Sequence, residues 1–280
     1  MTKTIATPSR TKEILETYGL SANKNYGQNF LVDPMLIQRC VEEANANDAV
    51  IEIGPGIGGL TEILAKSAKH VTAIEVDEKL VNVLNELFKD INNVEIIHED
   101  ILKVDIDELV SSLKEKYGNV VVCANLPYYI TSQILFTLFD NPDISTITVM
   151  VQKEVGERFV AKPSDSEYSA LSVEAQYLYD VKTLFKVPSR SFNPSPEVDS
   201  LIIQFNRKDI EVDKEEVKKF NEFVRGCFKQ RRKTIYNNLR EYLGDDVLVQ
   251  QVFDRTDISP KKRAQELSVE EIHQLYEASQ

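Results

Sequence analysis

The chain has 280 residues, 42% of them hydrophobic and 28% charged, which is enough for one large domain or two modest domains with buried cores. Its 45 acidic and 33 basic residues give a formal net charge of -12, which argues against nucleic-acid binding by the whole surface but leaves room for one basic face. No apolar run approaches the roughly 18 residues of a membrane span, and the N-terminus lacks the apolar stretch of a secretory signal. These features predict a soluble protein of the cytoplasm that does not bind membranes.

The cysteines and histidines give no sign of a disulfide or a metal site. The three cysteines, Cys40, Cys123 and Cys227, are far apart in apolar or helical contexts, which predicts reduced thiols. The three histidines are also scattered and lack the spacing of metal ligands. We therefore expect no bound metal.

Residues 33–152 alternate between helix-like and strand-like segments. Asp33 and Pro34 have the pattern of an N-cap and a first-turn proline, so a helix is expected to begin there. Strands are expected at 49–53, 71–76, 94–100, 119–124 and 146–152, and helices at 60–68, 77–89, 108–117 and 132–139. Strands that alternate with helices of about ten residues predict an α/β fold with a parallel, doubly wound sheet.

The pattern changes after residue 155. Two longer strands are expected at 177–187 and 200–208, on either side of a proline-rich segment, as an antiparallel edge of the sheet. From residue 207 onward only helical patterns occur, at 214–228, 233–243, 247–253 and 268–278. The sequence therefore predicts an α/β domain at 1–206 and a small all-helical domain at 207–280.

A glycine loop follows the first strand of the predicted sheet. Glycine in this place leaves backbone N–H groups accessible and lets a ligand approach closely. Gly54, Gly56 and Gly59 fit the G-x-G-x-x-G pattern of dinucleotide-binding proteins, whereas Gly54, Gly56 and Gly58 fit the E-x-G-x-G-x-G pattern of S-adenosylmethionine-dependent methyltransferases. A purely structural turn is the third interpretation, and the loop alone does not decide among them.

Two carboxylates at the ends of the next strands favour the methyltransferase. Glu75 ends the second strand, where it could accept hydrogen bonds from ribose hydroxyls. Asp100 follows the third strand, where it could accept from an adenine amine, although it could also be a helix N-cap. A dinucleotide-dependent enzyme needs neither Asp100 nor the cluster that follows the fourth strand. A methyltransferase needs both, with S-adenosylmethionine as the methyl donor.

That cluster reads Asn-Leu-Pro-Tyr. The side-chain oxygen of Asn125 and the backbone carbonyl of Leu126 could each accept a proton of an exocyclic base amine and aim its lone pair at a methyl group. Pro127 would stiffen the turn, and Tyr128 would stack on a flipped base. This scheme needs no general base, because the methylated nitrogen becomes acidic. The alternative is a simple strand-ending turn with Asn125 as its cap.

Over nearly its whole length the sequence resembles the KsgA (RsmA) family of small-subunit ribosomal RNA adenine dimethyltransferases. The motifs that carry the resemblance are YGQNFLVD (26–33), EIGPGIGGLT (52–61), NLPYYIT (125–131), FNPSPEVDS (192–200), RRKTIYNNL (231–239) and RAQELSVEE (263–271). Tyr26, where an apolar residue is common, is a minor variation. The resemblance implies a Rossmann-like class I methyltransferase domain. It also implies dimethylation of two adjacent adenines near the 3′ end of 16S rRNA during small-subunit biogenesis.

The resemblance also implies roles for individual residues. Residues of the segment 24–33, namely Gln28, Asn29 and Leu31, would close over the methyl donor, whose other parts would be held by Gly54, Gly56, Glu75, Asp100 and Asn125. Phe192 would form a second aromatic face that sandwiches the target adenine with Tyr128. Without the family, the alternative for Phe192 is a hydrophobic anchor beside two prolines. Tyr129 could belong to the packing or to the base pocket.

The basic residues concentrate in the helical domain. From Arg225 to Arg240 the chain carries six bases and no acid, and 260–263 adds three more. The candidate phosphate-binding residues are Arg225, Lys229, Arg231, Arg232, Lys233, Lys261, Lys262 and Arg263. Such segregated charge is typical of a protein that grips RNA on one side, although a solvated helix face is the alternative. The partner implied by the resemblance is 16S rRNA in the small ribosomal subunit, bound by a monomer.

Three other functions stay open. One is a resistance methyltransferase that modifies large-subunit rRNA, but such enzymes are usually strongly basic with an N-I-P-Y-like motif. Another is an assembly factor that acts by binding, which the complete donor loop and acceptor cluster disfavour as the sole role. The last is a nicotinamide-dependent oxidoreductase, for which no tyrosine–lysine or histidine constellation is present.

Overall fold

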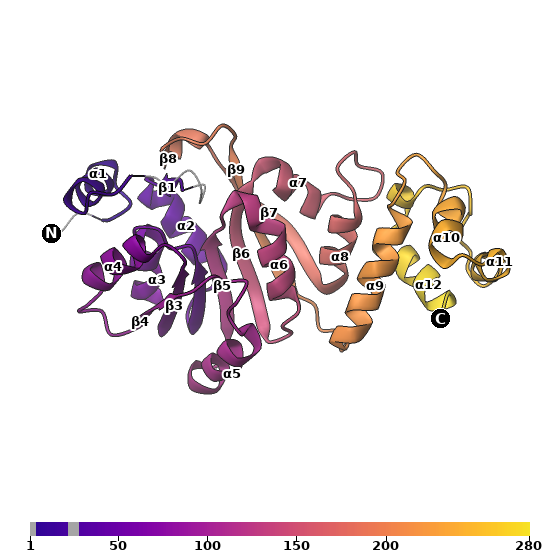
Figure 1. The fold of residues 1–280 in the computed structure, drawn as a ribbon, viewed down its shortest axis with the longest axis horizontal. Helices are drawn as coiled ribbons and strands as arrows, with labels where there is room; N and C mark the ends of the chain where they lie inside the picture. The colour runs from indigo at the N-terminus through magenta and orange to yellow at the C-terminus, as the bar shows by residue number, and fades with distance from the viewer. Residues whose placement is uncertain (1–3, 22–27) are drawn as a thin grey trace. The chain divides into compact units, whose positions relative to one another are not determined.

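The computed structural model describes residues 4–21 and 28–280, so Tyr26 lies outside the described residues. The chain divides into two compact units (Figure 1), one of Met1–Gly156 with Lys182–Arg207 and one of Glu157–Val181 with Lys208–Gln280. The sequence placed a boundary at 206, and the division after Arg207 lies next to it. The difference is the segment 157–181, which the sequence assigned to the first domain. It belongs to the helical unit because its helix packs against helices from the C-terminal part of the chain.

The first unit is built on a seven-stranded sheet in the order β4-β3-β2-β5-β6-β9-β7. The strands are β2 Ala49–Ile53, β3 His70–Glu75, β4 Val94–His98, β5 Val120–Asn125, β6 Ile144–Gln152, β7 Tyr179–Val187 and β9 Ser200–Arg207. The strands from β4 to β6 run parallel, whereas β9 runs antiparallel to β6. The predicted α/β fold, a parallel sheet with an antiparallel edge, is confirmed.

Helices flank this sheet on both faces (Figure 1). They are α2 Pro34–Ala44, α3 Gly59–Ser67, α4 Glu78–Leu87, α5 Ile106–Tyr117 and α6 Thr131–Phe139. Helix α1 Pro8–Thr17 precedes them in the chain, and α7 Lys153–Val160 follows β6 and has its second half in the other unit. The start of α2 is as predicted, because the Asp33 side chain accepts hydrogen bonds from the backbone N–H groups of Met35 and Leu36. Helices α1 and α7 were not predicted.

The inner strands are buried on both faces, which is why they read as continuous aliphatic runs. Val50 of β2 and Val121 of β5 lie in one core cluster with residues of α2 and α3. Side chains alternate along a strand, so Ile51 and Val122 face the opposite side, where α5 and α6 contact the sheet. The parallel register, with Ile53 opposite Ile74 and Ile51 opposite Val122, brings the carboxyl ends of β2, β3 and β5 to the same edge of the sheet.

A two-stranded sheet joins two segments that are far apart in the sequence. Strand β1 (Phe30–Leu31) pairs antiparallel with β8 (Phe192–Asn193), with Leu31 opposite Phe192. The backbone N–H of Val32 donates to the carbonyl of Ser191 across 2.8 Å. The segment expected to cover the methyl donor therefore lies beside the proline-rich segment that contains Phe192.

The second unit is a bundle of α8 Ala170–Leu178, α9 Lys214–Cys227, α10 Ile235–Leu243, α11 Asp246–Asp254 and α12 Val269–Ala278. Its core contains Phe220, Phe223, Leu239 and Leu275. The four helices expected after residue 207 are confirmed to within a few residues. Helix α8 was not predicted, and its last two residues had been assigned to the strand that begins at Tyr179. Within the described residues no helix is long and apolar enough to cross a membrane.

Candidate active site

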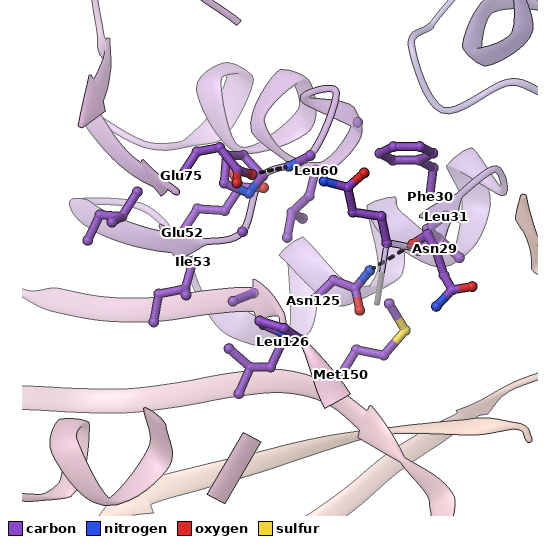
Figure 2. Close-up of a pocket in the computed structure, with 18 of the residues that line it drawn as sticks. Asn29, Phe30, Leu31, Glu52, Ile53, Leu60, Glu75, Asn125, Leu126 and Met150 are labelled. Atoms are coloured by element: carbon purple, nitrogen blue, oxygen red, sulfur yellow. Dashed lines mark hydrogen bonds between the residues drawn. The ribbon is translucent and has the colours of Figure 1, made fainter. Parts of the chain in front are cut away.

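A cavity of about 290 Å³ lies in the first unit, at the carboxyl ends of β2, β3 and β5 (Figure 2). This is where open α/β sheets bind ligands, and the volume is close to the lower limit of small-molecule sites, roughly 300 Å³. Ten predicted site residues line it: Gln28, Asn29, Leu31, Gly54, Gly56, Glu75, Asp100, Asn125, Leu126 and Tyr128. The fold thus brings together all of the predicted catalytic and donor-binding residues except Phe192.

The glycine loop between β2 and α3 forms one wall. A Cβ atom added at Gly54 would lie 3.8 Å from the carbonyl oxygen of Asn125 and 3.9 Å from Cδ of Pro127, so the loop runs close beside the Asn-Leu-Pro-Tyr segment. Gly58 has a φ of +86°, and a Cβ there would come within 2.5 Å of the Phe88 ring. Gly58 is therefore needed for the conformation and packing of the loop rather than for contact with a ligand.

Glu75 is held rigidly at the end of β3. Its Oε1 accepts hydrogen bonds from the backbone N–H groups of Val76 and Asp77 at 2.9 and 3.0 Å, and its Oε2 accepts one from Gly56 at 3.3 Å. Figure 2 shows the carboxylate directed at the loop. Burial raises the pKa of Glu75, and the three hydrogen bonds oppose this by stabilising the charged form.

Asp100 lines the cavity but does not cap a helix. The N-cap of α5 is Asp105, whose side chain accepts from Glu108. Asp100 instead closes a turn, because its Oδ1 accepts from the backbone N–H of Leu102 at 3.0 Å. One of its carboxylate oxygens therefore has a structural task, and the same residue borders the cavity.

Asn125 is tied to the segment that precedes β1. Its side-chain nitrogen donates to the backbone carbonyl of Asn29 across 3.4 Å (Figure 2). The backbone N–H of Leu126 donates to Met150 at 3.2 Å, and its side chain is buried. In the part of the chain that the structure describes, no hydrogen bond reaches Oδ1 of Asn125 or the carbonyl of Leu126. These two oxygens are the predicted acceptors.

The two tyrosines after Pro127 differ in their surroundings. The Tyr128 hydroxyl shares a hydrogen bond of 2.8 Å with Oγ of Ser200, which anchors a half-buried ring at the cavity, and burial raises its pKa. Tyr129 also lines the cavity but is 58% exposed. Of the two roles left open for Tyr129, packing in the core does not fit this exposure.

Phe192 lies apart from the other predicted residues. It is 4% exposed, packs in the cluster that contains Val187 and Ile202, and does not line the cavity. In this conformation its ring is a hydrophobic anchor for the β1–β8 pair. Stacking on a base would require the ring to leave this packing.

The sequence matches one protein family, described as ribosomal RNA adenine dimethylase, over residues 19–280. The chain belongs to the ribosomal RNA adenine dimethylase family. The dimethylase is 44% identical to ribosomal RNA small subunit methyltransferase A of Bacillus pumilus over 98% of this chain and 97% of that protein. It is 45% identical to the protein of the same name from Bacillus cereus over 99% of this chain and 97% of that protein.

Two solved structures are also similar to this chain. A dimethyladenosine transferase from Plasmodium falciparum matches with a TM-score of 0.69 and 25% identity, covering 87% of this chain and 94% of that one. The 23S rRNA methyltransferase ErmE matches with a TM-score of 0.67 and 26% identity, covering 89% and 99%. The resemblance, the enzyme class and the methyl donor expected from the sequence are thus confirmed: the dimethylase is an S-adenosylmethionine-dependent rRNA adenine methyltransferase.

Among the cavity residues that were not selected from the sequence, Glu52 is a buried acid. It is 1% exposed, lines the cavity, and accepts a hydrogen bond of 2.6 Å from the Thr61 hydroxyl. Burial raises its pKa to about 8, the Thr61 hydrogen bond opposes this, and the nearby charge of Glu75 adds to it. The signal was present, because Glu52 is the acidic residue that opens the E-x-G-x-G-x-G pattern.

The predicted phosphate-binding residues of the dimethylase lie in the helical unit, where several already have partners. Arg225 forms a two-pronged pair with the buried carboxylate of Glu174, at 2.9 and 3.0 Å. Lys229 and Lys233 both pair with Glu241 at 2.9 and 3.7 Å. The positive charge of residues 225–240 is therefore partly neutralised by Glu174 and Glu241.

The remaining bases differ among themselves. Lys262 pairs with Glu271 at 2.8 Å, and Arg231 donates to the backbone carbonyl of Ser166 at 2.6 Å. For Arg232, Lys261 and Arg263 no ion pair is found among the residues described. These three side chains are the best placed to meet phosphate without giving up an internal contact.

Proposed function

We propose that this enzyme transfers methyl groups to the N6 amines of two adjacent adenines near the 3′ end of 16S rRNA during biogenesis of the small ribosomal subunit. The observation that carries the proposal is the orientation of the Asn125 amide. Its nitrogen donates to the backbone carbonyl of Asn29, and its oxygen remains at the carboxyl end of β5. The small-subunit assignment is supported by relatives of 44–45% identity named ribosomal RNA small subunit methyltransferase A. We further propose that the enzyme works in the cytoplasm as a monomer.

The cavity suits a cationic donor. Four carboxylates line it, those of Glu52, Glu75, Glu99 and Asp100, and no lysine, arginine or histidine does so in the described chain. When bound, S-adenosylmethionine supplies an electrophilic methyl group on a positively charged sulfur. A site whose charged side chains, among the described residues, are all acidic favours such a ligand over a neutral or anionic one.

We assign the adenosine part of the donor to the loop and the two strand-end carboxylates. A carboxylate offers about four acceptor sites, and three N–H groups already occupy three of those of Glu75. One site on Oε2 is left for a ribose hydroxyl. Asp100 would accept from the adenine amine with the oxygen that does not close its turn, and Gly54 and Gly56 would allow close approach.

We assign the cover of the donor to the segment before and within β1. Gln28 donates from Nε2 to Oδ2 of Asp77 at 3.1 Å, which links this segment to the end of β3. Asn29 accepts from Asn125, which links it to the end of β5. Together with Leu31 these residues would shield the methyl group from water.

The target amine would be placed by two oxygens. Oδ1 of Asn125 and the carbonyl of Leu126 would each accept one N–H of the adenine amine, which favours a more tetrahedral nitrogen and points its lone pair at the methyl group. Asn125 does not remove a proton. The methylated nitrogen is acidic and loses its proton to water, and a second transfer at the same nitrogen gives the dimethyl product.

The adenine ring would stack on Tyr128, whose hydroxyl is fixed by Ser200. We assign the opposite face to Phe192, on the condition that its ring turns out of the core when RNA binds. The helical unit would hold RNA phosphates through the predicted basic residues, most directly through Arg232, Lys261 and Arg263.

The proposal is tested with unmethylated substrates. Purified enzyme and isotope-labelled S-adenosylmethionine are incubated with unmethylated small subunits or, separately, with large-subunit rRNA, and nucleosides are then analysed. Dimethyladenosine in the small-subunit sample is expected. Label only in the large-subunit sample would favour the resistance-type activity, and binding to small subunits without any methylation would favour an assembly factor that acts by binding.

A further inference from the structure

Glu52 is a buried carboxylic acid in the wall of the cavity. It lies on β2, directly below the glycine loop, with one oxygen taken by the Thr61 hydroxyl at 2.6 Å. No ion pair to Glu52 is found in the described chain, and no basic side chain lines the cavity. A carboxyl group in such surroundings favours its neutral form.

The titratable groups around Glu52 are acids or thiols. Glu75 lies at the end of the neighbouring strand β3, and its charge disfavours ionisation of Glu52. On the other side, Cys123 of β5 lies 3.9 Å from Cys40 of α2, sulfur to sulfur, and both are buried. Glu99 and Asp100 after β4 complete the acidic lining. Among the described residues no basic side chain lines the cavity to neutralise a charge on Glu52, whereas a cationic ligand can.

We propose that Glu52 is neutral while the cavity is empty and ionises when the cationic donor enters, so that donor binding releases a proton and favours the donor relative to its product. This inference rests on the proposed function, because it takes S-adenosylmethionine to be the ligand of the cavity. The carboxyl O–H bond breaks, the proton leaves to the buffer, and the carboxylate remains opposite the donor. No oxidant or further reactant is needed.

The reaction product provides a comparison that isolates the effect of the donor's positive charge. S-adenosylhomocysteine differs from the donor by the methyl group and by one positive charge. In a cavity of about 290 Å³ the sulfur of a bound ligand would lie within roughly 10 Å of Glu52. At that separation, one ion pair at an effective dielectric constant near 20 would change the affinity on the order of tenfold. Ionised Glu52 should therefore improve binding of the donor more than binding of the product.

Calorimetry measures the released proton directly. Donor is titrated into wild-type protein at pH 7 in two buffers of different ionisation enthalpy, and the difference in heat gives the number of protons released. Since the pKa of Glu52 is about 8 in the empty cavity and a tenfold interaction lowers it by about one unit, about half a proton should be released in excess of that from the Glu52→Gln variant. The ligand's own amino group titrates equally in both proteins, so the difference isolates Glu52.

Variants of Glu52 and Thr61 test the same inference through the affinities for donor and product. Glu52→Gln keeps an acceptor for Thr61 but cannot ionise, so the ratio of product to donor dissociation constants should fall about tenfold at pH 9, where Glu52 of the wild type is ionised, and only about twofold at pH 7. Thr61→Val removes a hydrogen bond that favours the charged form, so the rise of donor affinity with pH should move to higher pH. Glu108→Gln, at an exposed position of α5 that does not line the cavity, should behave like wild type.

The outcomes separate the inference from the function on which it rests. Equal proton release by wild type and Glu52→Gln, or an equal loss of affinity for donor and product, would overturn the inference while donor binding itself still supports the function. If the wild-type protein binds no donor, the proposed function fails first. Should Glu52→Gln not fold, as judged by circular dichroism, the wild-type buffer comparison and Thr61→Val decide the matter.

Discussion

The side-chain nitrogen of Asn125 and the backbone carbonyl oxygen of Asn29 lie 3.4 Å apart in a hydrogen bond. This contact determines the orientation of the Asn125 side-chain amide. The nitrogen is turned toward the segment before β1, and the oxygen is left as an acceptor at the end of β5. Because the contact uses the backbone of Asn29, the orientation of the Asn125 amide depends on the path of the segment 28–31 and not on the Asn29 side chain.

Gly58→Ala should destabilise the first unit by about 3 kcal/mol. An alanine at a φ of +86° costs about 1–2 kcal/mol, and its Cβ would meet the packed ring of Phe88 at 2.5 Å, which adds overpacking. Urea denaturation measures the change. Gly19→Ala is the matched control, because Gly19 has a φ of +60° but open space around it, so only about 1 kcal/mol is expected. Equal losses at the two positions would show that the Phe88 contact is unimportant.

Arg225→Ala should destabilise the helical unit by about 2 kcal/mol. Removal of the guanidinium leaves Glu174, 3% exposed, without its partner, while the exposure of Arg225 itself lessens the effect through solvent screening. The double change Arg225→Ala with Glu174→Gln should recover much of the loss, because it removes the buried charge. Thermal unfolding of the three variants tests this. A double variant no more stable than the single one would mean that the pair contributes by packing alone.

Arg232→Ala should weaken RNA binding without loss of stability. No ion pair to Arg232 is found in the described residues, so its removal breaks none. The slope of log affinity against log salt should become shallower by about 1, as expected for one lost phosphate contact. Donor affinity should not change. Binding to small subunits at several salt concentrations is the measurement, and an unchanged slope would remove Arg232 from the phosphate-binding residues.

Stability should fall as the pH rises through the titration of Glu52. Its pKa is about 8 in the folded protein and near 4.5 when unfolded, so the folded state binds the proton more tightly. The stabilisation is complete below pH 4.5, is lost as the pH rises toward 8, and amounts to at most about 1.4 kcal/mol per pH unit. Urea denaturation of wild type and Glu52→Gln at pH 6 and pH 8 gives the difference. Parallel pH profiles would contradict the raised pKa.

Much of the fold could be predicted because the signals are local. The strands β2 to β6 are short aliphatic runs, and α4 and α9 place their apolar residues on one side, so period and length identify them. Helix α8 escaped because its apolar residues Val173, Ala175 and Leu178 form no regular stripe. It is stabilised by packing against α9, some 40 residues later in the chain, which a local pattern does not reveal.

The candidate site likewise contains features that could be predicted from the sequence and features that could not. Glu75 and Asn125 could be predicted because the carboxyl ends of parallel strands meet at one edge of the sheet. Glu52 could have been selected as the first residue of the E-x-G-x-G-x-G pattern, but its raised pKa could not be predicted, because it results from burial in the folded chain. The partners of the basic run could not be predicted either, since Glu174 approaches Arg225 only after the chain has folded.

The most direct test of the account is the rate of the first methyl transfer catalysed by Asn125→Ala. Enzyme loaded with labelled donor is mixed with unmethylated small subunits in excess, and labelled adenosine is followed through a single turnover. Loss of the positioned oxygen should slow the transfer by about 100-fold or more, while the affinity for small subunits stays near that of wild type. A transfer rate close to that of wild type would contradict the central claim that Asn125 places the adenine amine for reaction.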